Sequence, residues 1–177
     1  MSTVTQEKDY GHVPVLLHEC LDALAIKPDG IYVDGTLGRA GHSLEIVKRL
    51  TTGRLIGIDR DETAIAAAQE RLADYGDRGT LVHSNFDRIG DILADLHIDG
   101  ADGMLFDLGV SSPQLDDAER GFSYMHDAPL DMRMDRTAYL TAREVVNSWS
   151  YEELRRILFE YGEERYAPAI AKRIVQH

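Results

Sequence analysis

The sequence has a single cysteine, no long apolar run and no excess of positive charge, and each absence excludes a class of protein. Cys20 is the one cysteine in 177 residues, so the chain has no disulfide framework, and it lacks the Cys/His clusters that bind zinc. No apolar run approaches the ~20 residues of a membrane-spanning helix, and residues 1–10 lack the apolar core of a signal peptide. We therefore expect a soluble, cytoplasmic protein with no metal site and no membrane partner.

The net charge of −12 argues against a large RNA-binding surface, because phosphate contacts usually require a basic one. Hydrophobic residues make up 44% of the chain, which is ample for a packed core. The length suits one domain of ordinary size with a small appendage. Composition leaves the oligomeric state open.

Short apolar runs alternate with helical patterns over the first hundred residues. This rhythm is typical of βαβ units, and it predicts an α/β fold of the doubly wound, Rossmann-like class with a parallel sheet. Pro14 suits the start of an opening helix. The expected strands cover residues 31–33, 54–58, 80–83 and 103–106, and the expected helices after the first cover residues 43–50, 61–74 and 89–96.

The rhythm stops after Asp107. Residues 111–136 carry two prolines and little periodicity, which predicts a long irregular loop of the kind that often binds a ligand. Thr141 and Ser150 each begin an S/T-x-x-E capping box, so a helix should follow each, and a third should run from about Tyr166. We expect a helical appendage in this part of the chain.

Acidic and amide side chains follow the expected strands. Asp34, Asp59 and Asp107 end three of them, and Asn85 follows the remaining one. In a doubly wound sheet the ligand lies across the carboxyl ends of the strands, so these side chains should meet at one site. Any one of them alone could merely cap a helix, but four together favour a binding site.

The loop after the first strand has the spacing Gly35-x-x-Gly38-x-x-Gly41, which lacks the Gly-x-Gly-x-x-Gly pattern of dinucleotide sites. Asp34 would lie beside a pyrophosphate with no compensating lysine, whereas it suits the sulfonium and ammonium of S-adenosylmethionine. The single carboxylate of that cofactor can face the amides of Ala40, Gly41 and His42 at a helix N-terminus. Asp59 can accept hydrogen bonds from the ribose hydroxyls. The ring of Phe86 can lie against the face of the adenine.

Longer motifs resemble one family. They lie at residues 12–16 (HVPVL), 34–36 (DGT), 41–43 (GHS), 58–61 (IDRD), 107–116 (DLGVSSPQLD), 120–123 (RGFS), 129–135 (PLDMRMD) and 161–165 (YGEER). Together they are similar to the bacterial 16S ribosomal RNA cytosine-N4 methyltransferases known as RsmH or MraW, over nearly the whole chain.

The resemblance implies transfer of a methyl group from S-adenosylmethionine to the exocyclic N4 amine of a cytidine in 16S rRNA, at the decoding centre of the small ribosomal subunit. It implies cofactor contacts at Ala40, Gly41, His42, Asp59, Phe86, Asp107 and Gln114. It also implies a helical insertion after Gln114, so that residues 1–114 form the cofactor-binding domain and residues 115–177 the loop and insertion. Members of the family continue beyond the position of His177, so we expect an incomplete sheet and a truncated insertion.

Ser112-Pro113-Gln114 resembles the Ser-Pro-Pro-aromatic loop of other amino-methyltransferases. A rigid proline fixes the preceding carbonyl, which can accept a hydrogen bond from the amine, and we predict that Ser112 and Pro113 are the catalytic residues. An ordinary turn is the alternative, because Ser and Pro are common in turns. His42 and His83 could act as an acid or a base, but a histidine at the start of a helix or in a strand is more often structural.

Two other functions remain open from the sequence. The first is a non-catalytic S-adenosylmethionine-binding fragment, since the end of the sheet is missing. The second is a nicotinamide-dependent oxidoreductase on a similar sheet.

Overall fold

The computed structural model describes residues 14–177, and the chain divides between Leu108 and Gly109 into two compact units. His12 and Val13 of the first motif lie outside the described residues. The predicted boundary after Gln114 falls within the second unit, and as a division by function it stays a prediction.

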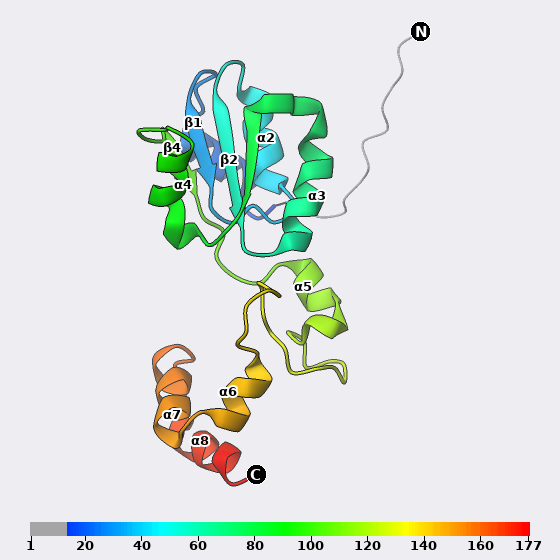
Figure 1. The fold of residues 1–177 in the computed structure, drawn as a ribbon, viewed down its shortest axis with the longest axis vertical. Helices are drawn as coiled ribbons and strands as arrows, with labels where there is room; N and C mark the ends of the chain where they lie inside the picture. Colours follow the sequence, from blue (N-terminus) through cyan, green and yellow to red (C-terminus); the bar gives the residue numbers. More distant parts are fainter. Residues whose placement is uncertain (1–13) are drawn as a thin grey trace. The chain divides into compact units, whose positions relative to one another are not determined.

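The first unit is built on a four-stranded parallel sheet, as the sequence predicted. Its strands are β1 (Ile31–Asp34), β2 (Arg54–Asp59), β3 (Gly79–His83) and β4 (Gly103–Leu105), in the order β3-β2-β1-β4 (Figure 1). The chain passes from β1 outward to β2 and β3, and then returns to the other side of β1 to form β4. The switch in strand order therefore lies between β1 and β4, where a doubly wound sheet binds its ligand.

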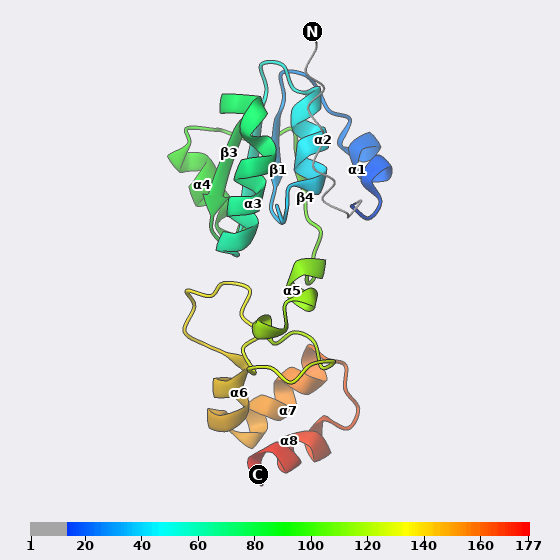
Figure 2. The ribbon, with the colours of Figure 1, turned by 90° about the vertical axis from the view of Figure 1, so that its right-hand side faces the viewer.

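Helices cover both faces of this sheet (Figure 2). Helices α1 (Leu17–Leu24), α2 (Gly41–Arg49) and α3 (Glu62–Leu72) pack against one face through a core that includes Tyr32 and Leu55. Helix α4 (Ile89–Asp95) packs against the other face, over Val33, Ile56 and Ile58. Two 3-10 turns, η1 (Ala73–Arg78) and η2 (Phe86–Arg88), complete the unit. The fold class is thus confirmed as α/β and doubly wound.

The register of the sheet brings the expected site residues to one edge. Asp34 of β1 pairs with Gly57 of β2 and with Leu105 of β4, while Asp59 of β2 pairs with His83 of β3. Because all four strands are parallel, their carboxyl ends and the loops that follow them meet at this edge.

The second unit is helical. It contains α5 (Ser112–Asp116), η3 (Ala118–Arg120), α6 (Ala142–Ser148), α7 (Tyr151–Glu160) and α8 (Ala167–Val175). The capping boxes at Thr141 and Ser150 are confirmed, since each begins a helix with both reciprocal bonds. The prediction of an irregular stretch from 111 to 136 is wrong at its start. There Ser111 and Gln114 form a capping box of the Ser-x-x-Gln type, which begins α5.

Two arginines organise the loop between η3 and α6. Arg120 is 5% exposed, and its Nη2 donates to the carbonyls of Arg133 (3.0 Å) and Met134 (3.0 Å). Arg133 in turn forms a two-bond ion pair with Asp131, with Nε–Oδ1 at 2.8 Å and Nη2–Oδ2 at 2.7 Å. The charged residues of the RGFS and PLDMRMD motifs therefore hold this loop in shape.

The Asp131–Arg133 pair makes the second unit sensitive to acid. The Arg133 guanidinium lowers the pKa of Asp131 from 3.8 to about 2. Because the folded-state pKa is depressed, the stabilisation is complete above about pH 4 and is lost as pH falls towards 2. After allowance for solvent screening we expect a loss of about 1–2 kcal/mol. Denaturant unfolding followed by fluorescence of the single tryptophan, Trp149, should show this loss.

Asp131→Asn is the matched variant for that measurement, since it keeps the shape of the side chain and removes its titration. The free energy of unfolding should differ between the two proteins at pH 6 and converge near pH 2. Parallel pH profiles would show that the ion pair contributes nothing to stability.

Within residues 14–177 no helix is long and apolar enough to cross a membrane. Over the same residues, no group of three or more His, Cys, Asp or Glu side chains is placed to hold a metal ion.

Candidate functional site

Asp34, at the end of β1, fixes the loop that follows this strand. This side chain is 1% exposed, and its Oδ2 accepts a 2.7 Å hydrogen bond from Ser43 Oγ while Oδ1 accepts from the amide of Thr36 at 3.2 Å. Burial raises the pKa of Asp34, and the two hydrogen bonds oppose that shift. Asp34 thus joins the strand end, the loop and the first turn of α2 beneath the surface of the site.

Asp59 fixes the same loop from the side of β2. Its Oδ2 accepts from the amide of Gly38 at 2.8 Å, and its Oδ1 accepts from the amide of Asp61 at 2.9 Å. Gly38 has a φ of 51°, a left-handed conformation that costs glycine little. Asp59 is half-buried, and each carboxylate oxygen has a second acceptor site. It can therefore hold the loop and still accept further hydrogen bonds.

A third set of bonds ties the loop to β4. The amide of Gly35 donates to the carbonyl of Leu105 at 2.9 Å, and Thr36 Oγ1 accepts from the amide of Asp107 at 2.7 Å. The Asp107 side chain is exposed at this edge. Loops after β1 and β4 therefore meet through specific bonds at the switch point.

The N-terminus of α2 lies at the end of this loop. Ala40 is its N-cap, with a φ of 58°, and the Ala40 amide already donates to the carbonyl of Leu37 at 2.8 Å. Gly41 and His42 supply the first two amides of the helix proper, where an anion is favoured. The His42 ring is buried, with its Nε2 3.2 Å from the carbonyl of Val15, which gives this histidine a structural contact.

Two phenylalanines close the loop on its other side. The rings of Phe86 and Phe106 meet edge to face, with their centroids 5.6 Å apart and an angle of 72° between their planes. A Cβ atom added to Gly35 would lie 2.4 Å from Phe106 Cε1, so a larger residue there would have to displace the ring. Phe106 is 44% exposed, which leaves part of its ring available at the edge.

The side-chain amide oxygen of Asn85 accepts no hydrogen bond within the described residues. Asn85 has the N-cap position of η2, yet its side chain makes no capping bond. Among the residues that the structure describes, its Oδ1 is the one buried side-chain nitrogen or oxygen atom without a hydrogen-bond partner. It directly follows Ser84, whose amide donates to the carbonyl of Asp59 at 2.9 Å. A buried acceptor without a partner therefore lies one residue after Ser84, which is bonded to the backbone of Asp59.

The three residues predicted from the SSPQ motif lie in the second unit, in the first turn of α5. Ser112 and Pro113 are half-buried, and Gln114 is 7% exposed. Gln114 Oε1 accepts from the amide of Ser111 at 3.0 Å, so this side chain caps α5. The structure thus gives Gln114 a local role, and its predicted contact with a cofactor stays a prediction.

Comparison with known proteins decides the family. The family model described as the MraW methylase family matches residues 9–177, which is almost the entire chain. The chain belongs to this family. The resemblance to this family is therefore confirmed.

Two curated relatives agree with this assignment. "Ribosomal RNA small subunit methyltransferase H" of Symbiobacterium thermophilum is 55% identical over 94% of this chain and 53% of its own length. The protein of the same name from Brevibacillus brevis is 58% identical over 94% of this chain and 54% of its own. The chain thus spans about half the length of the curated relatives it matches. Among solved structures, the C-terminal domain of precorrin-6Y C5,15-methyltransferase from Rhodobacter capsulatus matches with a TM-score of 0.45 and 23% identity, covering 57% of this chain and 52% of that one.

Sequence reasoning missed several residues that build this site. The hydroxyl of Ser43 donates to Asp34, and the hydroxyl of Thr36 accepts from the amide of Asp107. Both residues lie inside motifs of the MraW family, but the sequence of a motif does not show which group its hydroxyl binds. Phe106 falls at the end of the strand expected over residues 103–106, and it lies just beyond β4. Its aromatic type directly before Asp107 was the available signal, since a strand end at the ligand edge exposes its last side chains.

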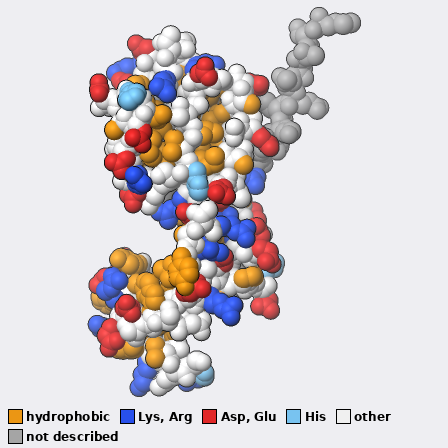
Figure 3. Space-filling model, in the orientation of Figure 1, with side chains coloured by type: hydrophobic (Ala, Val, Ile, Leu, Met, Phe, Trp, Pro, Cys, Tyr) orange, Lys and Arg blue, Asp and Glu red, His pale blue; other side chains and the backbone are white. Residues whose placement is uncertain are grey.

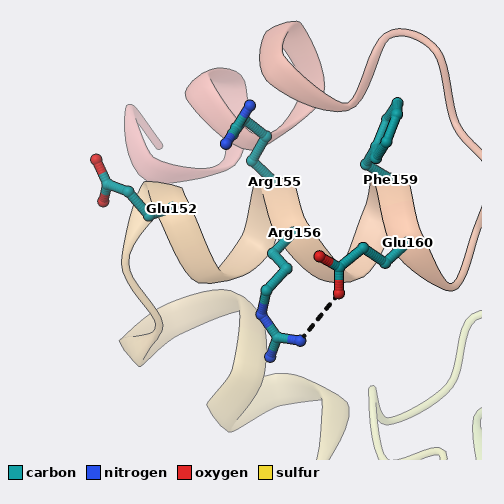
Figure 4. A pocket seen from close by; sticks show the side chains of 5 residues that line it. All are labelled: Glu152, Arg155, Arg156, Phe159 and Glu160. Atoms are coloured by element: carbon teal, nitrogen blue, oxygen red, sulfur yellow. Dashed lines mark hydrogen bonds and ion pairs between the residues drawn. The ribbon is translucent and has the colours of Figure 1, made fainter.

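A separate cavity of about 450 Å³ lies along α7. Figure 4 shows that its side chains all project from this one helix, with Arg156 paired to Glu160 at 3.3 Å. No residue predicted for the site lines it. The lining residues are Glu152, Arg155, Arg156, Phe159 and Glu160.

Hydrophobic side chains also reach the surface of both units (Figure 3). Leu108 is 70% exposed at the end of the first unit, and Tyr124 is 96% exposed in the second. Neither is part of the cluster around Asp34 and Asp59.

Proposed function

We propose that this chain is the cofactor-binding part of an S-adenosylmethionine-dependent methyltransferase that acts on the exocyclic N4 amine of a cytidine in 16S rRNA. The observation that carries the proposal is the loop at the switch point, which is bonded to Asp34 of β1, to Asp59 of β2 and to the end of β4 at Leu105 and Asp107. Membership of the MraW methylase family gives the reaction class. The relatives are named as small-subunit rRNA methyltransferases, which supports a ribosomal substrate in the cytoplasm.

The residues of the site fit S-adenosylmethionine. A half-buried carboxylate at Asp59 suits a ribose diol, because each of its oxygens has an acceptor position left. The first amides of α2, at Gly41 and His42, suit the cofactor's one carboxylate. The acidic edge around Asp59 and Asp107 suits a sulfonium and an ammonium, whereas a pyrophosphate would meet repulsion there.

The cofactor supplies an electrophilic methyl group when it is bound. The residues of this chain then have to hold the cofactor and position it for the reaction. Asp34 is a positioning residue, since its two hydrogen bonds fix Thr36 and Ser43 and leave it buried beneath the loop. Asp107, whose amide is held by Thr36, places an exposed carboxylate at the switch point. Correct positioning can account for roughly 7–11 kcal/mol of a barrier in the best cases.

Ser112 and Pro113 are the residues that we propose for the substrate amine. The amine of cytosine is a poor nucleophile because its lone pair is delocalised into the ring. A carbonyl fixed by Pro113 can accept a hydrogen from that amine, and Ser112 can accept the other or hold the turn. The base has to leave its stack to reach such a turn, and the net charge of −12 suggests that much of the RNA contact lies outside this chain.

Variants of α5 should separate substrate contacts from cofactor contacts. Ser112→Ala and Pro113→Ala should lower the single-turnover rate of methyl transfer about tenfold or more, with cofactor affinity near that of the wild type. Gln114→Ala should instead weaken cofactor binding, and it should also loosen α5 because the cap is lost. Gln114→Glu keeps the capping oxygen, so it separates these two effects. If all three alanine variants lose cofactor binding alike, our assignment of the chemistry to Ser112 and Pro113 is wrong.

The proposed activity is tested with labelled S-adenosylmethionine and small ribosomal subunits from cells that lack the modification. We expect label in the N4-methylated cytidine of 16S rRNA, at the decoding centre. Cofactor binding with no transfer under any condition would support the other possibility, a non-catalytic S-adenosylmethionine-binding fragment.

A further inference from the structure

The loop between η3 and α6, residues 121–141, exposes many apolar side chains that the site described above does not use. Tyr124 and Met125 lie at a turn, where the Met125 amide donates to Ser123 Oγ at 3.2 Å. Small or polar residues are usual at turns. Tyr124 is nonetheless 96% exposed and Tyr139 is 86% exposed. Such a concentration on one loop indicates a binding surface. The exposed large hydrophobic residues of the loop are Tyr124, Met125, Leu130, Met132, Tyr139 and Leu140.

Close contacts fix the part of the loop that carries Tyr124. Gly121 has a φ of 71°, and a Cβ atom added to it would clash with the carbonyl oxygen of Pro129. The chain therefore leaves and returns at one place, as in the compact surface loops that are frequently functional. At the base of this loop the guanidinium of Arg120 lies over the ring of Phe122, with Cζ 6.0 Å from the ring centroid.

Arg133 fixes the backbone that leads to Tyr139. Its Nη1 donates to the carbonyl of Arg136 at 3.1 Å and to the carbonyl of Ala138 at 2.7 Å. Tyr139 directly follows this second carbonyl. Both Tyr124 and Tyr139 therefore stand on backbone that is already held in place, so that binding through them costs little further ordering.

The loop is also richer in positive charge than the chain as a whole. Residues 120–143 carry four arginines and three aspartates, whereas the whole chain has 19 basic and 31 acidic residues. Arg136 and Arg143 are exposed. A fixed surface that combines exposed tyrosines with exposed arginines suits unpaired nucleotides. Aromatic rings stack on bases of any sequence, and guanidinium groups pair with the phosphates.

We propose that Tyr124 and Tyr139 stack on unpaired bases of the RNA substrate, with Arg136 and Arg143 against its phosphates. This inference rests on the proposed function, and it names the surface that holds the RNA around the target. A cytidine that leaves its stack to be methylated also leaves its neighbours without a stacking partner. Tyrosine rings that are already in place can supply the lost stacking, as aromatic side chains do in other proteins that bind single-stranded RNA.

Fluorescence anisotropy tests the stacking with a labelled single-stranded RNA oligonucleotide and with the same RNA as a duplex. The full chain, with S-adenosylhomocysteine present, should bind the single strand at least about tenfold more tightly, because the bases of a duplex are already stacked. Tyr124→Ala should weaken binding of the single strand about tenfold, and combining it with Tyr139→Ala should weaken it further. Tyr124→Phe keeps the ring, so it should keep the affinity.

Tyr166→Ala is the matched control, since it removes another exposed tyrosine of the second unit at the N-cap of α8, outside the loop. It should leave RNA affinity unchanged. The melting temperature of Tyr124→Ala should equal that of the wild type, because so exposed a side chain loses little burial. Its affinity for S-adenosylmethionine should also be unchanged.

A photoreactive benzoylphenylalanine in place of Tyr124 distinguishes RNA from a protein partner. After irradiation with small ribosomal subunits, this residue should be attached to 16S rRNA. Attachment to a ribosomal protein alone would show that the loop docks on protein and would overturn the inference.

The outcomes also separate this inference from the proposed function. Equal affinity of Tyr124→Ala and the wild type for the single strand, or no binding of the single strand by the wild type, would overturn the role of the tyrosines. Methyl transfer and S-adenosylmethionine binding are measured separately, so the methyltransferase proposal would then still stand. Loss of stacking-dependent RNA binding and absence of methyl transfer are thus different results.

Discussion

Asp59→Ala is expected to weaken binding of S-adenosylmethionine by about 100-fold or more. Two hydrogen bonds from the ribose to a charged acceptor are lost, at about 1.5 kcal/mol or more each. The variant also frees the amides of Gly38 and Asp61, which Asp59 holds at 2.8 and 2.9 Å, so the loop loses its fixed shape. Isothermal titration measures the affinity, and a thermal melt without ligand reports the cost to the fold.

Two further variants make the Asp59 result specific. Asp59→Asn keeps one acceptor oxygen and should lose an intermediate part of the affinity. Asp74→Ala removes an equal charge from an exposed position of the same unit and should have no effect. Wild-type affinity in a folded Asp59→Ala protein would remove Asp59 from the site.

Gly35→Ala should damage both the first unit and its binding site. The new methyl group would lie 2.4 Å from Phe106 Cε1 and 3.2 Å from Phe86 Cβ, so rings and loop would have to move apart. Overpacking of this kind costs about 1–3 kcal/mol, and the displaced loop should also lower cofactor affinity about tenfold. Melting temperature and calorimetry on the same sample would show both losses.

Phe106→Leu should partly rescue that variant, because it removes the ring that the methyl group would meet. The double variant should then be more stable than the sum of the two single effects predicts. Gly90→Ala, at a helical position with open space around its Cβ, should cost nothing. If the effects of Gly35→Ala and Phe106→Leu simply add, the close packing of Gly35 and Phe106 does not govern the site.

The sequence predicted the sheet well for physical reasons. A strand buried on both faces needs an uninterrupted apolar run, as in residues 55–58. A helix that covers such a strand needs a periodic apolar stripe, as in residues 89–96. Both signals are local, so they can be read without the structure. Capping boxes at Thr141 and Ser150 are local too. The same rule applied to Ser111 and Gln114 predicts α5, but the two prolines of residues 111–136 favoured a loop.

The sequence predicted which strand ends form the site, but not the hydrogen bonds that connect them. Strand ends at Asp34, Asp59 and Asp107 could be placed at one edge because parallel strands share that edge. Their partners could not be predicted, since the bonds of Asp34 to Ser43 and of Thr36 to Asp107 depend on how loops from different strands meet. That the Asn85 oxygen has no hydrogen-bond partner could not be predicted either, because it depends on the positions of all neighbouring donors.

The central claim is that the loops at the carboxyl edge of this sheet bind S-adenosylmethionine. Calorimetric titration of the chain with S-adenosylmethionine and, separately, with NAD tests it most directly. Our account predicts saturable binding of S-adenosylmethionine with one molecule per chain and no response to NAD. Tight binding of NAD with no response to S-adenosylmethionine would contradict the account and favour a nicotinamide-dependent oxidoreductase.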